Sequence, residues 1–203
     1  MSKELSVSLS PAVVAAPTRV SNLLRAAGII AGGSALAAVC AHVSIPLFFT
    51  PVPLSLQPFA VLLLGLLLTP RMAAVTFGAY LLEGAAGLPV FAPTPVVPGV
   101  AHLFGPTGGY LLAYPLAAAL ISFLWRQTGR GFASAIACAA TGDLAILSCG
   151  AIWLAAFTSL PALPAATAAV IPFLPGDALK IIAAAGMAVG AASLYRRSAA
   201  RNA

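Results

Sequence analysis

Apolar residues dominate this chain in long runs, and short polar or proline-rich stretches separate the runs. A run of about 20 apolar residues is long enough for a helix to cross the hydrocarbon core of a bilayer. The pattern predicts six membrane-spanning helices, over 23–43, 59–68, 72–86, 107–125, 132–159 and 176–195. Because 59–68 is too short to span alone, we expect it to begin in the preceding loop or to tilt.

Three connecting stretches are dense in proline: 45–58, 87–111 and 161–175 hold four, five and four of the 17 prolines. Proline fixes φ and has no backbone N–H to donate, so we expect stiff, non-helical loops. The middle stretch ends in GPTGGY, where Gly108 and Gly109 allow another group to approach closely. It predicts a rigid lid over a small-molecule site, and the two glycines either contact the ligand or let the next helix pack closely.

The composition makes lipid the main solvent. The chain is 61% hydrophobic and 7% charged, with a mean hydropathy of +1.04, whereas a soluble domain carries about 25% charged residues. We therefore expect an all-α integral membrane protein, with a cytoplasmic tail at 1–22, a six-helix domain at 23–195 and a basic tail at 196–203. A net charge of +6 is compatible with binding to nucleic acid. The charges flank apolar runs instead of forming a continuous basic patch, which argues against a nucleic-acid partner.

The distribution of basic residues predicts the topology. If the six segments cross alternately, nine of the ten Lys and Arg residues fall on one side and none on the other. The nine are Lys3, Arg19, Arg25, Arg71, Arg126, Arg130, Arg196, Arg197 and Arg201. Cytoplasmic loops of membrane proteins carry the excess of Lys and Arg. Both termini are therefore expected in the cytoplasm, with the proline-rich loops on the outer face.

Lys180 is the only basic residue inside a predicted span, and Asp177 precedes it by three residues on the same helix face. An ionisable residue at membrane depth is costly unless it is paired or faces a polar cavity. One interpretation is a local ion pair that neutralises itself. The other is a substrate site in which Lys180 attracts a ligand carboxylate and Asp177 accepts hydrogen bonds from ligand N–H groups.

Five further side chains are candidates for the same site: Glu83, Gln57, Tyr110, Phe91 and Trp153. Glu83 and Gln57 could accept hydrogen bonds from ligand N–H groups, and the three aromatic residues could stack on an apolar ring. The alternatives are a solvated interfacial Glu83, a loop-capping Gln57 and ordinary aromatic anchors at the membrane interface. The two histidines and three cysteines suggest no metal site.

The first predicted helix carries small residues four apart, at Gly33, Ala37 and Ala41. Such a stripe lets another helix approach closely in a membrane. Packing within this protein and docking of an external partner are both compatible with it.

An enzyme is the less favoured alternative. Asp143 and Asp177 could form the acid pair of a membrane hydrolase, but Lys180 lies one turn from Asp177, and such a pair needs to be free of a competing cation. The chain contains no HExxH and no GxSxG. No Lys-Ser/Thr follows the glycines of GPTGGY, so it is not a phosphate loop. Active transport would require energy from a partner or an ion gradient.

Four motifs together resemble a known family: PVPLSLQ at 51–57, GLPVF at 87–91, GPTGGYL at 105–111 and PGDALK at 175–180. Over about 23–195 the sequence resembles the biotin-specific substrate-binding (S) component of energy-coupling factor (ECF) transporters. Ser55 stands where Thr is frequent in that family. The region around the third helix offers Glu83 and no Arg, where some relatives use an amide or Arg to hold the ligand.

The resemblance implies a six-helix S-component fold in a bacterial or archaeal plasma membrane. It implies capture of biotin from the outer face, association with a transmembrane coupling protein and two cytoplasmic ATPases, no cofactor and no enzymatic activity. Asp177 and Lys180 match the family's acidic and basic residues, and the stripe at Gly33, Ala37 and Ala41 lies where S components usually meet the coupling protein. A carrier for another small vitamin remains the alternative, because the choice of biotin depends on the resemblance.

Overall fold

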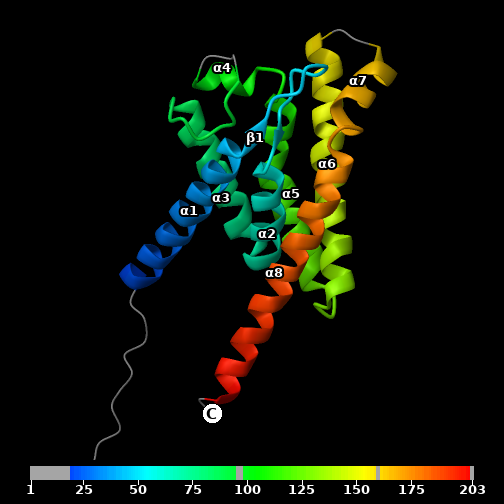
Figure 1. The fold of residues 1–203 in the computed structure, drawn as a ribbon. Helices are drawn as coiled ribbons and strands as arrows, with labels where there is room; N and C mark the ends of the chain where they lie inside the picture. Colours follow the sequence, from blue (N-terminus) through cyan, green and yellow to red (C-terminus); the bar gives the residue numbers. More distant parts are fainter. Residues whose placement is uncertain (1–18, 95–97, 159–160, 202–203) are drawn as a thin grey trace, which may run out of the picture.

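The computed structural model describes residues 19–94, 98–158 and 161–201, which are almost entirely helical (Figure 1). The elements in chain order are α1 (Arg19–His42), β1 (Ser44–Ile45), β2 (Leu54–Ser55), α2 (Gln57–Leu67), α3 (Pro70–Ala85), α4 (Val100–Leu103), α5 (Gly108–Arg126), α6 (Phe132–Thr158), α7 (Ala162–Val170) and α8 (Leu174–Arg201). The long helices run along the molecule, and α4, α7 and the loops next to them gather at one end, which we call the loop end.

Among the described residues, four helical stretches are long and apolar enough to cross a membrane: Arg19–His42, Gly108–Arg126, Phe132–Thr158 and Ala166–Ser198. The sequence predicted six spanning helices. Helices α2 and α3 are present, but they have only 11 and 16 residues. A count of six spans therefore stays a prediction, whereas an apolar helical protein with four span candidates is established.

Helix α2 lies at the centre of the molecule, among five other helices. It contacts α1, α3, α5, α6 and α8, and residues 60–66 are all buried. A helix that is apolar on every side belongs in such an interior. Its sequence, QPFAVLLLGLL, has no polar face to present elsewhere.

The proline-rich stretches contain more regular structure than expected. The first forms an antiparallel hairpin in which Ser44 pairs with Ser55 and Ile45 with Leu54, so the fold is not purely helical. The third, which follows the undescribed residues 159–160, contains α7 and the start of α8. Proline is compatible with a first helical turn, because the N–H it lacks would be unpaired there. Pro164 and Pro175 occupy such positions, which corrects the expectation of a non-helical loop.

The predicted division into two tails and a six-helix domain stays a prediction, but the helices at both ends extend into the predicted tails. Helix α1 begins at Arg19, inside the predicted N-terminal tail at 1–22, and α8 continues to Arg201 through most of the predicted tail at 196–203. Residues 1–18 and 202–203 lie outside the described part of the chain.

The small-residue stripe of α1 faces inward. Ala37 and Ala41 are fully buried, and a Cβ on Gly33 would lie 2.6 Å from Cγ2 of Thr76 on α3. Gly33, Ala37 and Ala41 therefore let α1 pack closely on α2 and α3. Of the two roles considered for the stripe, this favours packing within the protein, and a partner interface at these residues stays a prediction.

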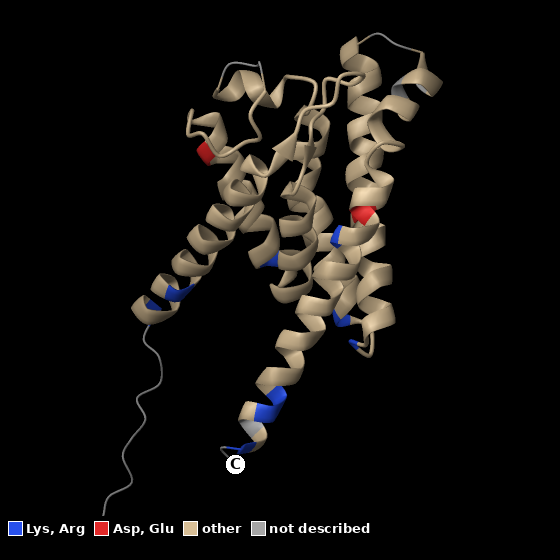
Figure 2. Cartoon of the chain, in the orientation of Figure 1, with Lys and Arg blue, Asp and Glu red and all other residues tan. Residues whose placement is uncertain are grey.

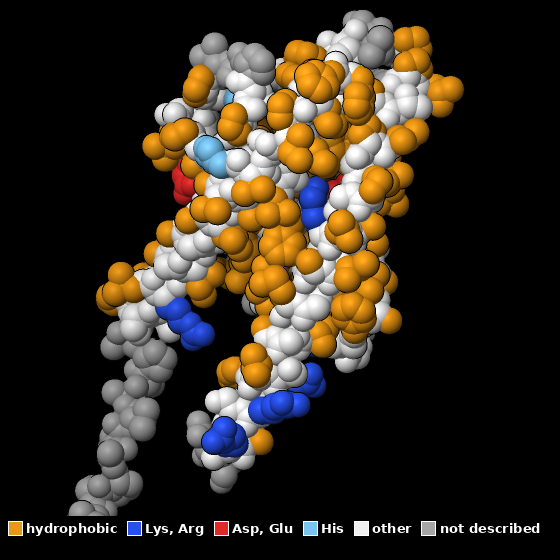
Figure 3. Space-filling view, in the orientation of Figure 1, with side chains coloured by type: hydrophobic (Ala, Val, Ile, Leu, Met, Phe, Trp, Pro, Cys, Tyr) orange, Lys and Arg blue, Asp and Glu red, His pale blue; other side chains and the backbone are white. Residues whose placement is uncertain are grey.

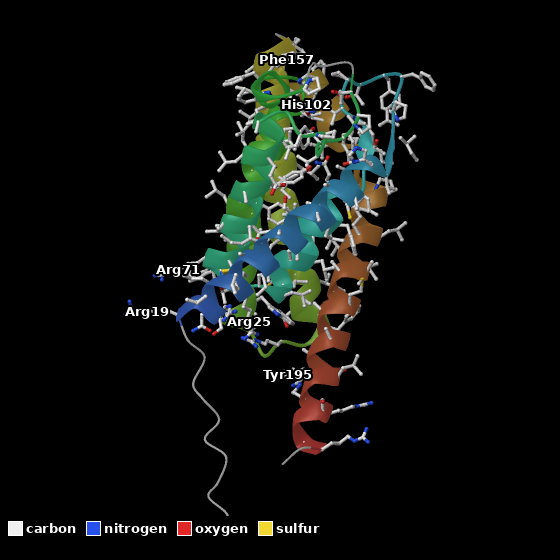
Figure 4. The ribbon with its side chains drawn as sticks, turned by 90° about the vertical axis from the view of Figure 1, so that its left-hand side faces the viewer. Arg19, Arg25, Arg71, His102, Phe157 and Tyr195 are labelled. Carbon is white, nitrogen blue, oxygen red and sulfur yellow. The ribbon has the colours of Figure 1, made fainter. Side chains whose placement is uncertain are left out.

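Basic residues gather at the end opposite the loop end (Figure 2). Arg19, Arg25 and Arg71 lie toward that end, whereas His102 and Phe157 lie toward the loop end (Figure 4). The space-filling view shows hydrophobic side chains over much of the face between the two ends (Figure 3). This charge distribution agrees with the pattern expected from the sequence.

Candidate functional site

A cavity lies beneath the loop end, between α5, α6 and α8, with walls from the β-hairpin region and α4. The space between its walls amounts to about 540 Å³, part of it open to the outside. Most of its lining surface is apolar, and polar groups converge on it from several elements, which is typical of small-molecule sites. The polar members are Ser55, Gln57, His102, Thr107, Tyr110, Tyr114, Asp143, Asp177 and Lys180.

Lys180 and Asp177 form the charged part of this cavity. Both lie in the first turns of α8, and their i, i+3 spacing places them on one helix face. Lys180 Nζ donates to Asp177 Oδ1 at 2.8 Å. The residues are only 7% and 2% exposed, so the pair is buried and also borders the cavity. The two interpretations of this pair, ion pair and cavity site, are thus compatible.

Gln57 is positioned by a short chain of hydrogen bonds. Its Nε2 donates to the Tyr80 hydroxyl at 2.6 Å, which donates to the Val90 carbonyl at 2.7 Å. Ser55 Oγ donates to Gln57 Oε1 at 3.2 Å. These bonds fix the start of α2 against α3 and the loop that follows it, with the Gln57 amide in the cavity wall.

Tyr110 lines the cavity and ties α5 to α7, because its hydroxyl donates to the Ala169 carbonyl at 2.8 Å. A Cβ on Gly150 of α6 would lie 2.2 Å from the Tyr110 ring. Gly150 therefore makes the room that this ring occupies.

Gly108 and Gly109 contribute to packing instead of lining the cavity. A Cβ on Gly108 would lie 2.0 Å from the Leu103 carbonyl oxygen, and one on Gly109 would lie 2.2 Å from Cβ of Trp153. Trp153 itself donates from Nε1 to the Gly105 carbonyl at 2.8 Å. These contacts hold α5 against α4 and α6. Of the two roles considered for these glycines, ligand contact and close helix packing, they favour close packing.

Two further candidates lie outside the cavity lining. Ser34 on α1 donates a hydrogen bond to Glu83, so this carboxyl joins α1 to α3. The Phe91 ring lies 5.0 Å from the His102 ring, tilted by 39°, and 5.3 Å from the Tyr80 ring in an edge-on arrangement. Phe91 thus packs against His102, which lines the cavity, whereas Glu83 joins two helices that contribute no residue to the lining.

Sequence reasoning undervalued two cavity residues, Asp143 and His102. Asp143 stands alone in an apolar helix, and that isolation was a usable signal because intramembrane acids tend to be functional. His102 is 6% exposed, and burial lowers its pKa from the ordinary value. It is therefore neutral near pH 7 and adds no positive charge to the cavity.

Comparisons with known proteins agree with this architecture. The model of the BioY family matches residues 10–197. The probable biotin transporter BioY of Pyrococcus horikoshii is 39% identical over 72% of this chain and 83% of its own length. Biotin transporter BioY2 of Lactococcus lactis is 38% identical over 76% of this chain and 82% of its own length.

A solved structure is also similar. The crystal structure of the S-component for biotin from an ECF-type ABC transporter superposes with a TM-score of 0.79 and 27% sequence identity. The alignment covers 88% of this chain and 95% of the other. The family model, the curated relatives and the shared fold lead to one conclusion: this chain belongs to the BioY family.

Proposed function

We propose that this protein is the membrane-embedded biotin-binding component of a vitamin uptake transporter. The observation that carries the proposal is the cavity beneath the loop end, where the buried Lys180–Asp177 pair meets apolar and aromatic walls. Biotin offers a ureido group with two N–H donors and one carbonyl acceptor, an apolar thioether ring and a carboxylate. The cavity supplies groups complementary to each part.

The charges favour one orientation of the ligand. Lys180 is already paired with Asp177, and Asp143 borders the same cavity. A ligand carboxylate placed there would be a third acid beside one ammonium, and like charges repel strongly where water is scarce. The ureido group fits better, with its carbonyl toward Lys180 and an N–H toward Asp177. This differs from the expectation that Lys180 attracts the carboxylate.

Other residues that line the cavity would then contact the thioether ring and the carboxylate of biotin. Tyr110, Phe173 and Leu147 offer apolar surface to the thioether ring. The carboxylate would point toward the loop end, where the Thr107 hydroxyl lines the cavity.

Topology and partners follow from the same proposal. The arginines gather at the end away from the cavity, so the positive-inside rule puts them in the cytoplasm together with both termini. The cavity would then open to the outer face of a bacterial or archaeal plasma membrane. A transmembrane coupling protein and two cytoplasmic ATPases would supply the energy, since the sequence shows no phosphate loop of its own.

A panel of vitamins tests the choice of ligand. A ligand present at 100 times its Kd stabilises the folded state by about 2.7 kcal/mol, which raises Tm by roughly 5–10 °C for a domain of this size. We expect biotin to produce this shift in the purified protein, and thiamin and riboflavin to produce none. A shift with another vitamin and none with biotin would favour the alternative carrier.

A paired-aspartate hydrolase has less support. Its two acids would share a proton. Asp177 instead accepts a hydrogen bond from Lys180, and Asp143 Oδ1 has no hydrogen-bond partner in the described part of the chain.

A further inference from the structure

Tyr80 connects the loop after α3 to the cavity wall, although it is not among the described residues that line the cavity. Its side chain is fully buried on α3. The hydroxyl lies 2.6 Å from Gln57 Nε2 and 2.7 Å from the Val90 carbonyl oxygen. Gln57 Oε1 in turn lies 3.2 Å from Ser55 Oγ, and both of these residues line the cavity. One buried hydroxyl therefore belongs to a chain of hydrogen bonds that reaches the ligand space.

The chemistry of these four groups allows the chain of hydrogen bonds only one direction. A backbone carbonyl can only accept, so the single hydroxyl proton of Tyr80 is donated to Val90. The Tyr80 oxygen is then left to accept, which requires the Gln57 amide to turn its NH2 end toward Tyr80. Gln57 Oε1 therefore points the other way and accepts the hydroxyl proton of Ser55. Ser55 Oγ keeps only lone pairs for a further partner.

We propose that Tyr80 is a positioning residue that determines ligand specificity by fixing the orientation of the Gln57 amide. With the amide held in this way, Gln57 Oε1 and Ser55 Oγ present acceptor oxygens on one wall of the cavity. This wall favours a ligand group that donates from N–H or O–H and disfavours a carboxylate. Biotin at neutral pH donates only from its two ureido nitrogens, so the wall favours its ureido ring. The inference rests on the proposed function and adds a residue that lies outside the cavity.

Tyr80→Phe removes the hydroxyl and keeps the ring. The ring lies edge-on to Phe91, with centroids 5.3 Å apart, and edge-on to Phe77 at 6.3 Å, so these aromatic contacts should persist. Without the hydroxyl, the Gln57 amide is free to rotate by half a turn and to present its NH2 end to the ligand. We expect the affinity for biotin to fall about 3-fold to 10-fold, as for the loss of one neutral hydrogen bond. Equilibrium binding of radiolabelled biotin measures it.

Two further variants separate positioning from stability. Ser122→Ala removes another fully buried hydroxyl that donates to a backbone carbonyl, that of Leu68 at 2.6 Å, away from the cavity lining. It should lower Tm by about as much as Tyr80→Phe and leave the affinity for biotin unchanged. In Gln57→Leu no amide is left to orient, so adding Tyr80→Phe should not weaken binding further. Such non-additivity is expected of two groups that act together.

The amide can also be observed directly, because Gln57 and Gln127 are the only glutamines in the chain. In NMR spectra of protein made with isotope-labelled glutamine, the exposed Gln127 amide is the internal reference. The NH2 protons of Gln57 should exchange with water at least about 10-fold more slowly than those of Gln127, because Gln57 donates to Tyr80. Tyr80→Phe should speed the exchange of the Gln57 protons, and Ser122→Ala should not.

The outcomes distinguish this inference from the proposed function. Unchanged biotin affinity in folded Tyr80→Phe, or an equal loss of affinity in the wild-type and Gln57→Leu backgrounds, would overturn the positioning role. An equal loss in Ser122→Ala would show a general loosening of the fold and overturn it too. Rapid exchange of the Gln57 NH2 protons in the wild type would overturn the orientation of the amide, whether or not the protein binds biotin. Failure of the folded wild type to bind biotin would instead overturn the proposed function.

Discussion

Replacing Lys180 with Met is expected to weaken biotin binding by about 100-fold or more. Truncating one partner of a buried, hydrogen-bonded charge pair in a binding interface costs about 2–5 kcal/mol of binding free energy, and every 1.4 kcal/mol is tenfold in Kd. The variant loses the donor to the ureido carbonyl and leaves Asp177 buried without its 2.8 Å partner. Equilibrium binding of radiolabelled biotin to purified protein measures the effect.

Two controls separate binding from folding. Arg197→Met removes a cation from the exposed far end of α8 and should leave affinity unchanged. The double variant Asp177→Asn/Lys180→Met removes both charges, so it should recover thermal stability without recovering binding. Wild-type affinity in a folded Lys180→Met protein would remove Lys180 from the site.

Gly109→Ala should lower the thermal stability substantially. The added Cβ would lie 2.2 Å from Cβ of Trp153 and 2.6 Å from the Cys149 carbonyl oxygen, so α5 and α6 must separate. Overpacking of this kind costs about 1–3 kcal/mol, or roughly 3–10 °C in Tm for a domain of this size. Thermal unfolding of the ligand-free protein in detergent measures it.

Gly28→Ala is the matched control, because a Cβ on Gly28 meets nothing within 4 Å among the described residues. It makes the same chemical change in a helix and should leave Tm unchanged or slightly raised. Equal Tm values for the two variants would contradict the packing role assigned to Gly109.

The long apolar helices and the charge asymmetry could be predicted from the sequence because both depend on local composition. The Lys180–Asp177 pair could also be predicted, since i, i+3 neighbours share a helix face regardless of the rest of the fold. The central place of α2 could not be, because its short apolar run resembles an incomplete span until the five surrounding helices are known.

The other differences have the same origin in tertiary packing. A stripe of small residues has the same sequence pattern whether it packs within the protein or against a partner. The contact between Gly33 and Thr76 of α3, which favours packing within the protein, is visible only in the fold. Glu83 resembled a site residue because Ser34, its partner, lies 49 residues away in the sequence. Helix α7 could not be predicted, because prolines in the first turn of a helix and prolines in a loop give the same local sequence pattern.

The central claim is that this single chain binds biotin in the cavity that Lys180 and Asp177 border. Calorimetric titration of biotin into the purified wild-type protein tests it most directly. The account predicts saturable one-to-one binding that Lys180→Met weakens by about 100-fold or more and that Arg197→Met preserves. No saturable binding of biotin by the folded wild-type protein, or binding that Lys180→Met leaves intact, would contradict it.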